Sequence, residues 1–191
     1  MEKGRLEAFS DGVIAIIITI MVLEMKAPHG AELTALRPLI PVFLSYILSF
    51  IYVGIYWNNH HHLFQAVEQV NGRVLWANLH LLFWLSLLPF ATAWMGENLF
   101  AVFPVACYGV VLFAAAIAYY VLSRTLVAHH GKGSTLAEAL GRDGKGKFSL
   151  ACYGIAIGLS FANPWIAFAL YVSVAVMWLV PDRRIERKLL S

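Results

Sequence analysis

The segment RLEAFSDGVIAIIITIMVLEMK, from Arg5 to Lys26, decides the fold of this chain, because it is too apolar for the surface of a soluble protein. Its centre runs for twelve residues from Gly12 to Leu23 and carries one hydroxyl group, that of Thr19. A helix that is apolar on every side is buried in a large core or crosses a membrane. The segment therefore predicts a first membrane-spanning helix that is preceded by charged residues.

The composition places the whole chain in the same class. Of its 191 residues, 60% are hydrophobic and 13% are charged, and the mean hydropathy is +0.71. Soluble domains average roughly 45–50% apolar and about 25% charged residues. Cys107 and Cys152 lie in apolar runs and predict neither a disulfide nor a metal site. The sequence has no P-loop, dinucleotide fingerprint or nucleophile elbow, so we do not expect an enzyme.

Six apolar runs follow one another, separated by proline, glycine and asparagine signals. A bilayer core of about 30 Å needs about 20 helical residues. We therefore expect an all-α membrane protein in which residues 1–191 form a single domain of six transmembrane helices. The expected spans are about 6–25, 37–59, 73–95, 100–124, 147–162 and 164–181, of which the fifth is short.

The lysines and arginines predict how these spans are oriented. With the N-terminus in the cytoplasm, the outer loops hold only Lys26 and Arg37. The inner segments hold twelve basic residues: Lys3, Arg5, Arg73, Arg124, Lys132, Arg142, Lys145, Lys147, Arg183, Arg184, Arg187 and Lys188. This bias follows the positive-inside rule. It predicts a multi-pass protein of the cell membrane with both termini in the cytoplasm.

Ser10 and Asp11 bring polar groups to the start of the first span, where ionisable side chains usually face protein or water. Glu7 and Asp11 are four residues apart and share one helix face, so a cation such as Arg5 would relieve their repulsion. Three interpretations are open. Ser10 and Asp11 either cap the first helix, belong to a packing network, or contact an ion directly.

A second polar group is the segment WNNHHHLF, Trp57 to Phe64, at the inner end of the second span. Three consecutive histidines point about 100° apart on a helix and cannot all bind one metal. We favour a hydrogen-bond network between helices that includes one or two of these histidines and His80 of the third span. Interfacial polar residues beneath an aromatic belt and a metal site completed from another segment are the alternatives, and no metal is predicted.

The residues from Arg5 to Asp11 resemble the R-x-x-x-F-S-D signature of the transmembrane protein 175 family, which are potassium-permeable channels of animal endolysosomes and of bacteria. The family's tryptophan-and-histidine segment after the second span is similar to the segment found here. A chain with one six-span repeat resembles the bacterial members, which implies a homotetramer. The matching positions, expected to act as a structural network, are Arg5, Phe9, Ser10, Asp11, Trp57, His60 and His61.

The same resemblance implies that the first helix lines the pore. Its constriction would be formed by Ile16, Ile20 and Leu23, while Thr19 would contribute to potassium selectivity. Independently, the three aliphatic positions are spaced i, i+4, i+7, which is one face of a helix. The chain has no TVGYG-like filter, so we expect a gate that works by dewetting and a modest preference for K⁺ over Na⁺.

Glu24 follows the aliphatic positions at the outer mouth, where four copies would form an acidic ring unless Lys26 neutralises it. The expected partners are the protein itself, the bilayer and monovalent cations, with no cofactor beyond K⁺ as permeant ion and no nucleic acid. Two other function classes are open. In the first, the chain would be a secondary or proton-coupled cation transporter. In the second, it would be a membrane assembly protein without transport.

Overall fold

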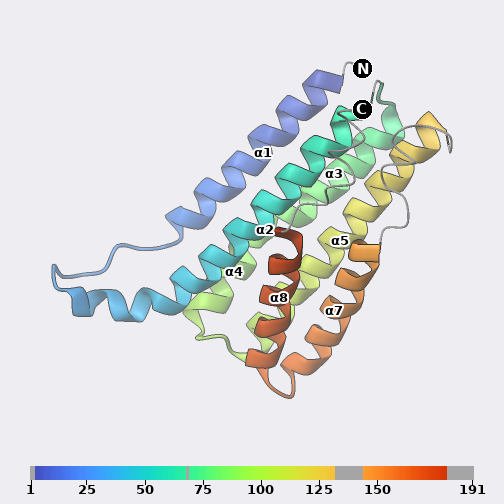
Figure 1. Cartoon of the computed structure of the whole chain (residues 1–191). Helices are drawn as coiled ribbons and strands as arrows, with labels where there is room; N and C mark the ends of the chain where they lie inside the picture. Colours follow the sequence, from blue (N-terminus) through green and yellow to red (C-terminus); the bar gives the residue numbers. More distant parts are fainter. Residues whose placement is uncertain (1–2, 68, 132–143, 180–191) are drawn as a thin grey trace.

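In the computed structural model, which describes residues 3–67, 69–131 and 144–179, the chain is a bundle of helices (Figure 1). The helices run roughly alongside one another, with α1 at one edge and α7 and α8 on the other side of the bundle. Their bounds are α1 Lys3–Leu23, α2 Ile40–Gln65, α3 Gly72–Ser86, α4 Leu88–Glu97, α5 Val102–His130, α7 Gly144–Ser160 and α8 Pro164–Leu179. A short 3-10 helix, η1 (Leu33–Leu39), leads into α2.

Four helical segments within these ranges are long and apolar enough to cross a membrane: Lys3–Leu23, Leu33–Gln65, Gly72–Glu97 and Val102–His130. The two helices that are not among these four segments, α7 and α8, have 17 and 16 described residues. At about 1.5 Å per residue each is roughly 25 Å long. The all-helical class and the membrane character that the sequence predicts agree with the structure.

At two predicted spans the helices differ in their bounds from the expected ones. The second helix does not end near residue 59 but continues to Gln65, so the histidine segment is helical. The candidate span Gly72–Glu97 is interrupted within its helix at Leu87, because α3 ends at Ser86 and α4 begins at Leu88. The physical reason is Pro89 in the first turn of α4, which has no N–H to donate to the preceding turn.

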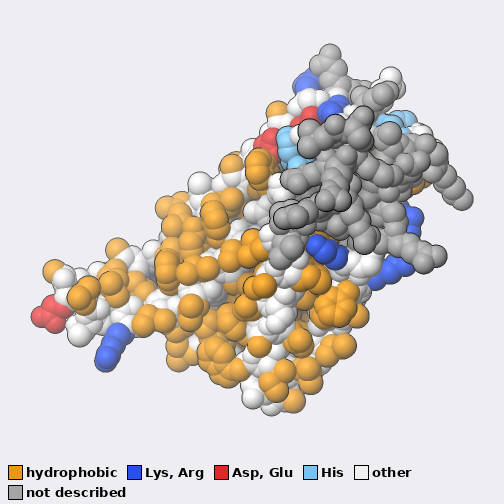
Figure 2. All heavy atoms as spheres, in the orientation of Figure 1, with side chains coloured by type: hydrophobic (Ala, Val, Ile, Leu, Met, Phe, Trp, Pro, Cys, Tyr) orange, Lys and Arg blue, Asp and Glu red, His pale blue; other side chains and the backbone are white. Residues whose placement is uncertain are grey.

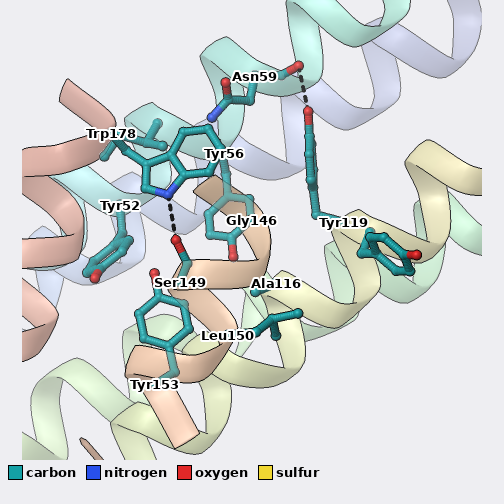
Figure 3. A pocket seen from close by; sticks show the side chains of 12 residues that line it. Tyr52, Tyr56, Asn59, Ala116, Tyr119, Gly146, Ser149, Leu150, Tyr153 and Trp178 are labelled. Carbon is teal, nitrogen blue, oxygen red and sulfur yellow. Dashed lines mark hydrogen bonds between the residues drawn. The ribbon is translucent and has the colours of Figure 1, made fainter. Parts of the chain in front are cut away.

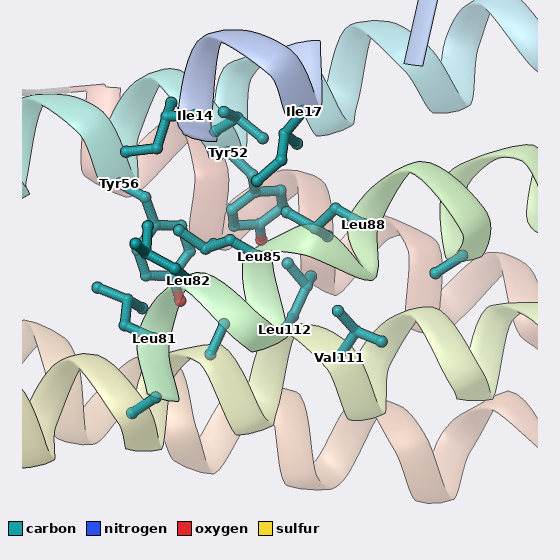
Figure 4. Close-up of a cluster of buried hydrophobic side chains, with 14 of the residues drawn as sticks. Ile14, Ile17, Tyr52, Tyr56, Leu81, Leu82, Leu85, Leu88, Val111 and Leu112 are labelled. Carbon is teal, nitrogen blue, oxygen red and sulfur yellow. The ribbon is translucent and has the colours of Figure 1, made fainter. Parts of the chain in front are cut away.

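The buried apolar core includes residues of every α-helix of the bundle, α7 and α8 among them, and α1 packs onto α2, α3 and α4. Ile14 and Ile17 of α1 point into the same apolar cluster as Tyr52, Leu85 and Leu88 (Figure 4). This cluster fixes which side of α1 faces its own subunit.

The backbones of α2 and α4 approach closely at Gly96. A Cβ atom there would lie 2.5 Å from the Ser45 hydroxyl oxygen and 2.7 Å from the Cα of Val42. Only glycine fits such an approach without movement of the helices.

The surface divides into an apolar flank and a polar end (Figure 2). Apolar side chains cover most of the visible face, while histidines and most basic side chains gather at the end where the N-terminus lies. Large apolar side chains such as Trp76, Phe103 and Leu33 are 75%, 69% and 85% exposed. Such a surface suits hydrocarbon rather than water, as expected of a membrane protein.

Candidate functional site

The two sides of α1 differ in burial although both are apolar. Ile14, Ile17 and Met21 are each 2% exposed and pack against the core. Successive residues on a helix point 100° apart, so a different set of side chains lies on the opposite side of α1. The structure places the predicted aliphatic positions on that opposite side, where Ile16, Ile20 and Leu23 are 57%, 40% and 76% exposed.

Thr19 lies on the flank of this exposed face. Its hydroxyl donates a hydrogen bond of 2.8 Å to the backbone oxygen of Ile16. Because the single hydroxyl proton is used in this bond, the lone pairs of the oxygen stay available as acceptors. The arrangement offers an oxygen atom beside the aliphatic side chains, which is the chemistry that a cation requires.

A buried chain of hydrogen bonds holds α1 to α2 and α3. The Ser10 hydroxyl donates to the Leu6 backbone oxygen at 2.9 Å, and the Asn78 side-chain nitrogen donates to the Ser10 oxygen at 2.9 Å. The Asn78 side-chain oxygen lies 2.8 Å from the Nε2 atom of His60. Ser10 and Asn78 are fully buried and His60 is 2% exposed. This chain is the network between helices that the histidine segment predicted, with Asn78 as its bridge.

The direction of these bonds fixes the tautomer of His60. The only proton of the Ser10 hydroxyl goes to Leu6, so Ser10 must accept from the NH₂ group of Asn78. The amide oxygen of Asn78 therefore faces His60, whose Nε2 carries the proton and donates.

Asp11 lies next to this chain on the exposed surface. Its carboxylate accepts a hydrogen bond of 3.0 Å from the indole nitrogen of Trp57 on α2. The Trp57 ring stacks on His61, with ring centroids 5.9 Å apart and planes 15° apart. The capping interpretation of Ser10 and Asp11 is wrong, because α1 begins seven residues earlier, at Lys3. Both residues hold α1 against α2 and α3.

The remaining residues of the predicted network lie outside these bonds. His80 is exposed and accepts from the Trp84 indole nitrogen on its own helix at 3.0 Å, so it does not join His60 as expected. Arg5 and Phe9 are exposed, and within the described residues no ion pair joins Arg5 to Asp11. The indole N–H of Trp57, rather than a cation, contacts the Asp11 carboxylate.

Glu24 follows α1 at the end of the bundle opposite the N-terminus and is exposed. The basic Lys26 nearby is also exposed. No ion pair joins the two in the part of the chain that the structure describes. In the same ranges, no group of three histidine, cysteine or acidic residues is placed to hold a metal ion.

A separate cavity of about 50 Å³ lies between α2, α5, α7 and α8 (Figure 3). Tyr56, Tyr119 and Tyr153 contribute to its walls, and Trp178 donates to the Ser149 hydroxyl at 2.9 Å. No residue of α1 lines it. The sequence did not predict this cavity, since its tyrosines come from three helices far apart in the chain.

Comparison with known proteins identifies the family to which this chain belongs. Residues 5–89, which include most of α1 and the histidine segment, match the model of the endosomal/lysosomal potassium channel TMEM175. A potassium channel of Chryseobacterium sp. (strain P1-3) is 58% identical over 189 residues, covering 99% of this chain and 98% of that protein. This chain belongs to the TMEM175 family. The predicted resemblance is thereby confirmed, and relatives of this kind are named as ion channels rather than enzymes.

TMEM175 relatives are similar in structure as well. A crystal structure of a lysosomal potassium-selective channel TMEM175 homolog from Chamaesiphon minutus has a TM-score of 0.80 and 30% sequence identity, and covers 93% of this chain and 96% of that one. The human protein, named an endosomal/lysosomal proton channel TMEM175, is 30% identical over 187 residues, and this chain covers 36% of its length. The TMEM175 fold thus extends over most of this chain.

Proposed function

We propose that this protein is a potassium channel in which four copies assemble around a pore lined by α1. The Chryseobacterium relative, a named potassium channel, matches almost the full length of both proteins. The Chamaesiphon homolog of similar fold is described as potassium-selective. K⁺ is the permeant ion in this proposal, and the bilayer and three sister subunits are the partners.

The observation that carries the pore assignment is the exposed aliphatic face of α1. Ile16, Ile20 and Leu23 lie on one side, while the other side packs into the subunit's own core. Around a fourfold axis, four such faces would meet and form rings of aliphatic side chains. Narrow apolar rings exclude water when closed and so gate ion flow by dewetting.

Thr19 supplies the polar group for selectivity in this proposal. Four Thr19 oxygens, each free to accept, would replace part of the hydration shell of a passing K⁺ ion. One ring of hydroxyls replaces fewer waters than a stack of carbonyl rings, so the preference for K⁺ over Na⁺ is modest. Four copies of Glu24 at the adjacent mouth would raise the local cation concentration.

The orientation in the membrane follows from the same assignment. All six helical segments span the bilayer, with α3 and α4 together forming one span, and α7 and α8 crossing as the two shortest. In this proposal the basic end of the bundle (Figure 2) faces the cytoplasm, in accordance with the positive-inside rule, and the protein is a cell-membrane protein with both termini inside.

The experiment that tests the pore is a flux assay in liposomes loaded with K⁺ and containing the purified protein. Passive K⁺ efflux is expected, and Ile20→Ala should increase it severalfold because it widens an aliphatic ring. Ile40→Ala, which removes the same side chain from an exposed position on α2, serves as the control and should leave efflux unchanged. Unchanged efflux in Ile20→Ala, with normal folding, would exclude α1 as the pore lining.

The same liposomes test selectivity. Thr19→Val keeps the shape of the side chain but removes its oxygen, so the ratio of K⁺ to Na⁺ efflux should fall toward one. An unaltered ratio would show that selectivity arises elsewhere.

A proton-coupled or proton-conducting function is the second candidate, because animal relatives are named proton channels. A pH-sensitive dye inside the liposomes separates the possibilities. A channel carries K⁺ passively down its gradient without an imposed pH difference. A coupled transporter moves K⁺ slowly and in proportion to the pH difference.

A further inference from the structure

A basic groove lies between the start of α3 and the end of α5, on the outside of the subunit and away from α1. It has a volume of about 490 Å³, and the described residues that line it belong to α3, to its N-cap Asn71 and to α5. Its charged members are Arg73, in the first turn of α3, and Arg124, near the end of α5. His129 also lines the groove, and its Nδ1 atom lies 3.0 Å from the Asn71 side-chain nitrogen. This groove has no place in the pore proposed above.

In the part of the chain that the structure describes, no carboxylate balances the charge of the two arginines. Both side chains are exposed, and within the described residues neither forms an ion pair with a carboxylate. Arg73 also adds its charge to the positive end of the α3 dipole, which is an unfavourable position for a cation. An anion in the groove would balance the charge of the two arginines and would also interact favourably with the positive end of the α3 dipole.

The geometry around Arg124 leaves it ready to bind. Its Nε atom donates to the Tyr120 hydroxyl at 3.1 Å, and its guanidinium carbon lies 5.2 Å from the centre of the Tyr120 ring. A guanidinium has five N–H donors, so four of them stay free of this bond. A fixed guanidinium with free donors matches the oxygens of a phosphate group.

The surroundings of the groove favour a lipid over a soluble anion. Arg124 continues a line of exposed aliphatic side chains along α5, Val110, Ile117 and Val121, which are 46%, 38% and 39% exposed. Trp76, one turn along α3 from Arg73, is 75% exposed, as is typical of tryptophan at the level of lipid headgroups. A phosphate at the arginines would thus have its acyl chains beside an apolar strip.

We infer that this groove binds the phosphate headgroup of an anionic phospholipid from the leaflet at the N-terminal end of the bundle. Basic pockets between transmembrane helices are known to bind such headgroups. The two guanidinium groups contact the phosphate, and the chains lie along the strip of α5. Bound lipid stabilises the contact between α3 and α5 independently of ion flow.

The test measures binding of phosphatidylglycerol that carries a fluorophore on its acyl chain to the full-length protein in an uncharged detergent. Each basic contact with an anionic lipid contributes about a fivefold change in affinity. The double variant Arg73→Gln/Arg124→Gln should therefore bind roughly 25-fold more weakly. The double variant Arg73→Lys/Arg124→Lys, which keeps the charge, should retain most of the affinity.

Arg37→Gln, which removes an exposed arginine from η1 at the other end of the bundle, is the matched control and should bind as the unchanged protein does. Circular dichroism verifies that each variant is folded, and the single variant Arg124→Gln, about fivefold weaker, replaces the double variant if the latter does not fold. Unlabelled phosphatidylglycerol should displace the probe, whereas phosphatidylcholine and inorganic phosphate should not. Equal affinity in the glutamine variant, an equal loss in Arg37→Gln, or displacement by inorganic phosphate alone would overturn the inference.

Discussion

At the scale of single residues, Asn78 has a structural role that the family signature does not reveal. Its amide bridges Ser10 of α1 and His60 of α2, and all three side chains are buried. Because the surroundings are apolar, a buried polar group left without a partner costs about 1–3 kcal/mol. The signature serine is therefore held in place by a residue 68 positions further along the chain.

Replacing Asn78 by leucine tests this role. The variant keeps the approximate volume but leaves Ser10 and His60 without their shared partner, so we expect a loss of about 1–3 kcal/mol in stability. Thermal unfolding in detergent, followed by tryptophan fluorescence, measures the loss as a lower melting temperature. Asn58→Leu, at an exposed position of α2, is the control and should change little. Equal melting temperatures for the two variants would show that the bridge is not important for stability.

At the scale of helices, packing between α2 and α4 depends on the absence of a side chain at Gly96. The close approach brings together α2, which carries His60 and Trp57, and α4, which also packs against α1. The position of α1 is thus set from two directions, by hydrogen bonds to α2 and α3 and by apolar contact with α4.

Gly96→Ala should separate α2 from α4, because the added carbon would overlap the backbone of Val42. Overpacking of this kind costs about 1–3 kcal/mol. Gly54→Ala is a matched control, since a Cβ atom at Gly54 of α2 would meet no other atom within 4 Å. Alanine favours a helix over glycine by roughly 1 kcal/mol, so this control should hold or raise the melting temperature. A Gly96→Ala protein as stable as the control would contradict the close packing.

At the scale of the whole molecule, the proposed assembly of four copies would cover the exposed aliphatic face of α1. In one subunit this face is largely uncovered, with Ile16, Ile20 and Leu23 exposed by 57%, 40% and 76%. If four copies meet along α1, the four Leu23 side chains approach one another at the end of the helix. A position at the same end but on α5, such as Phe103, would instead face away from the axis.

Cross-linking distinguishes these positions. In a background in which Cys107 and Cys152 are replaced by alanine, Leu23→Cys should form oxidant-induced dimers of the subunit in membranes. Phe103→Cys, at a position that is similarly exposed, should stay monomeric on a denaturing gel. Dimers through Phe103→Cys and none through Leu23→Cys would place α1 on the outside of the assembly.

The sequence by itself determined the membrane class, the family and the set of aliphatic positions on α1, because these depend on composition, spacing and a short local signature. It did not determine which side of α1 is buried, since α1 is apolar on all sides and its periodicity is correspondingly weak. Only the tertiary structure decided that Ile14, Ile17 and Met21 face the core. It also decided that Asn78 rather than His80 completes the network, because hydrogen-bond partners far apart in the chain are chosen by how helices pack.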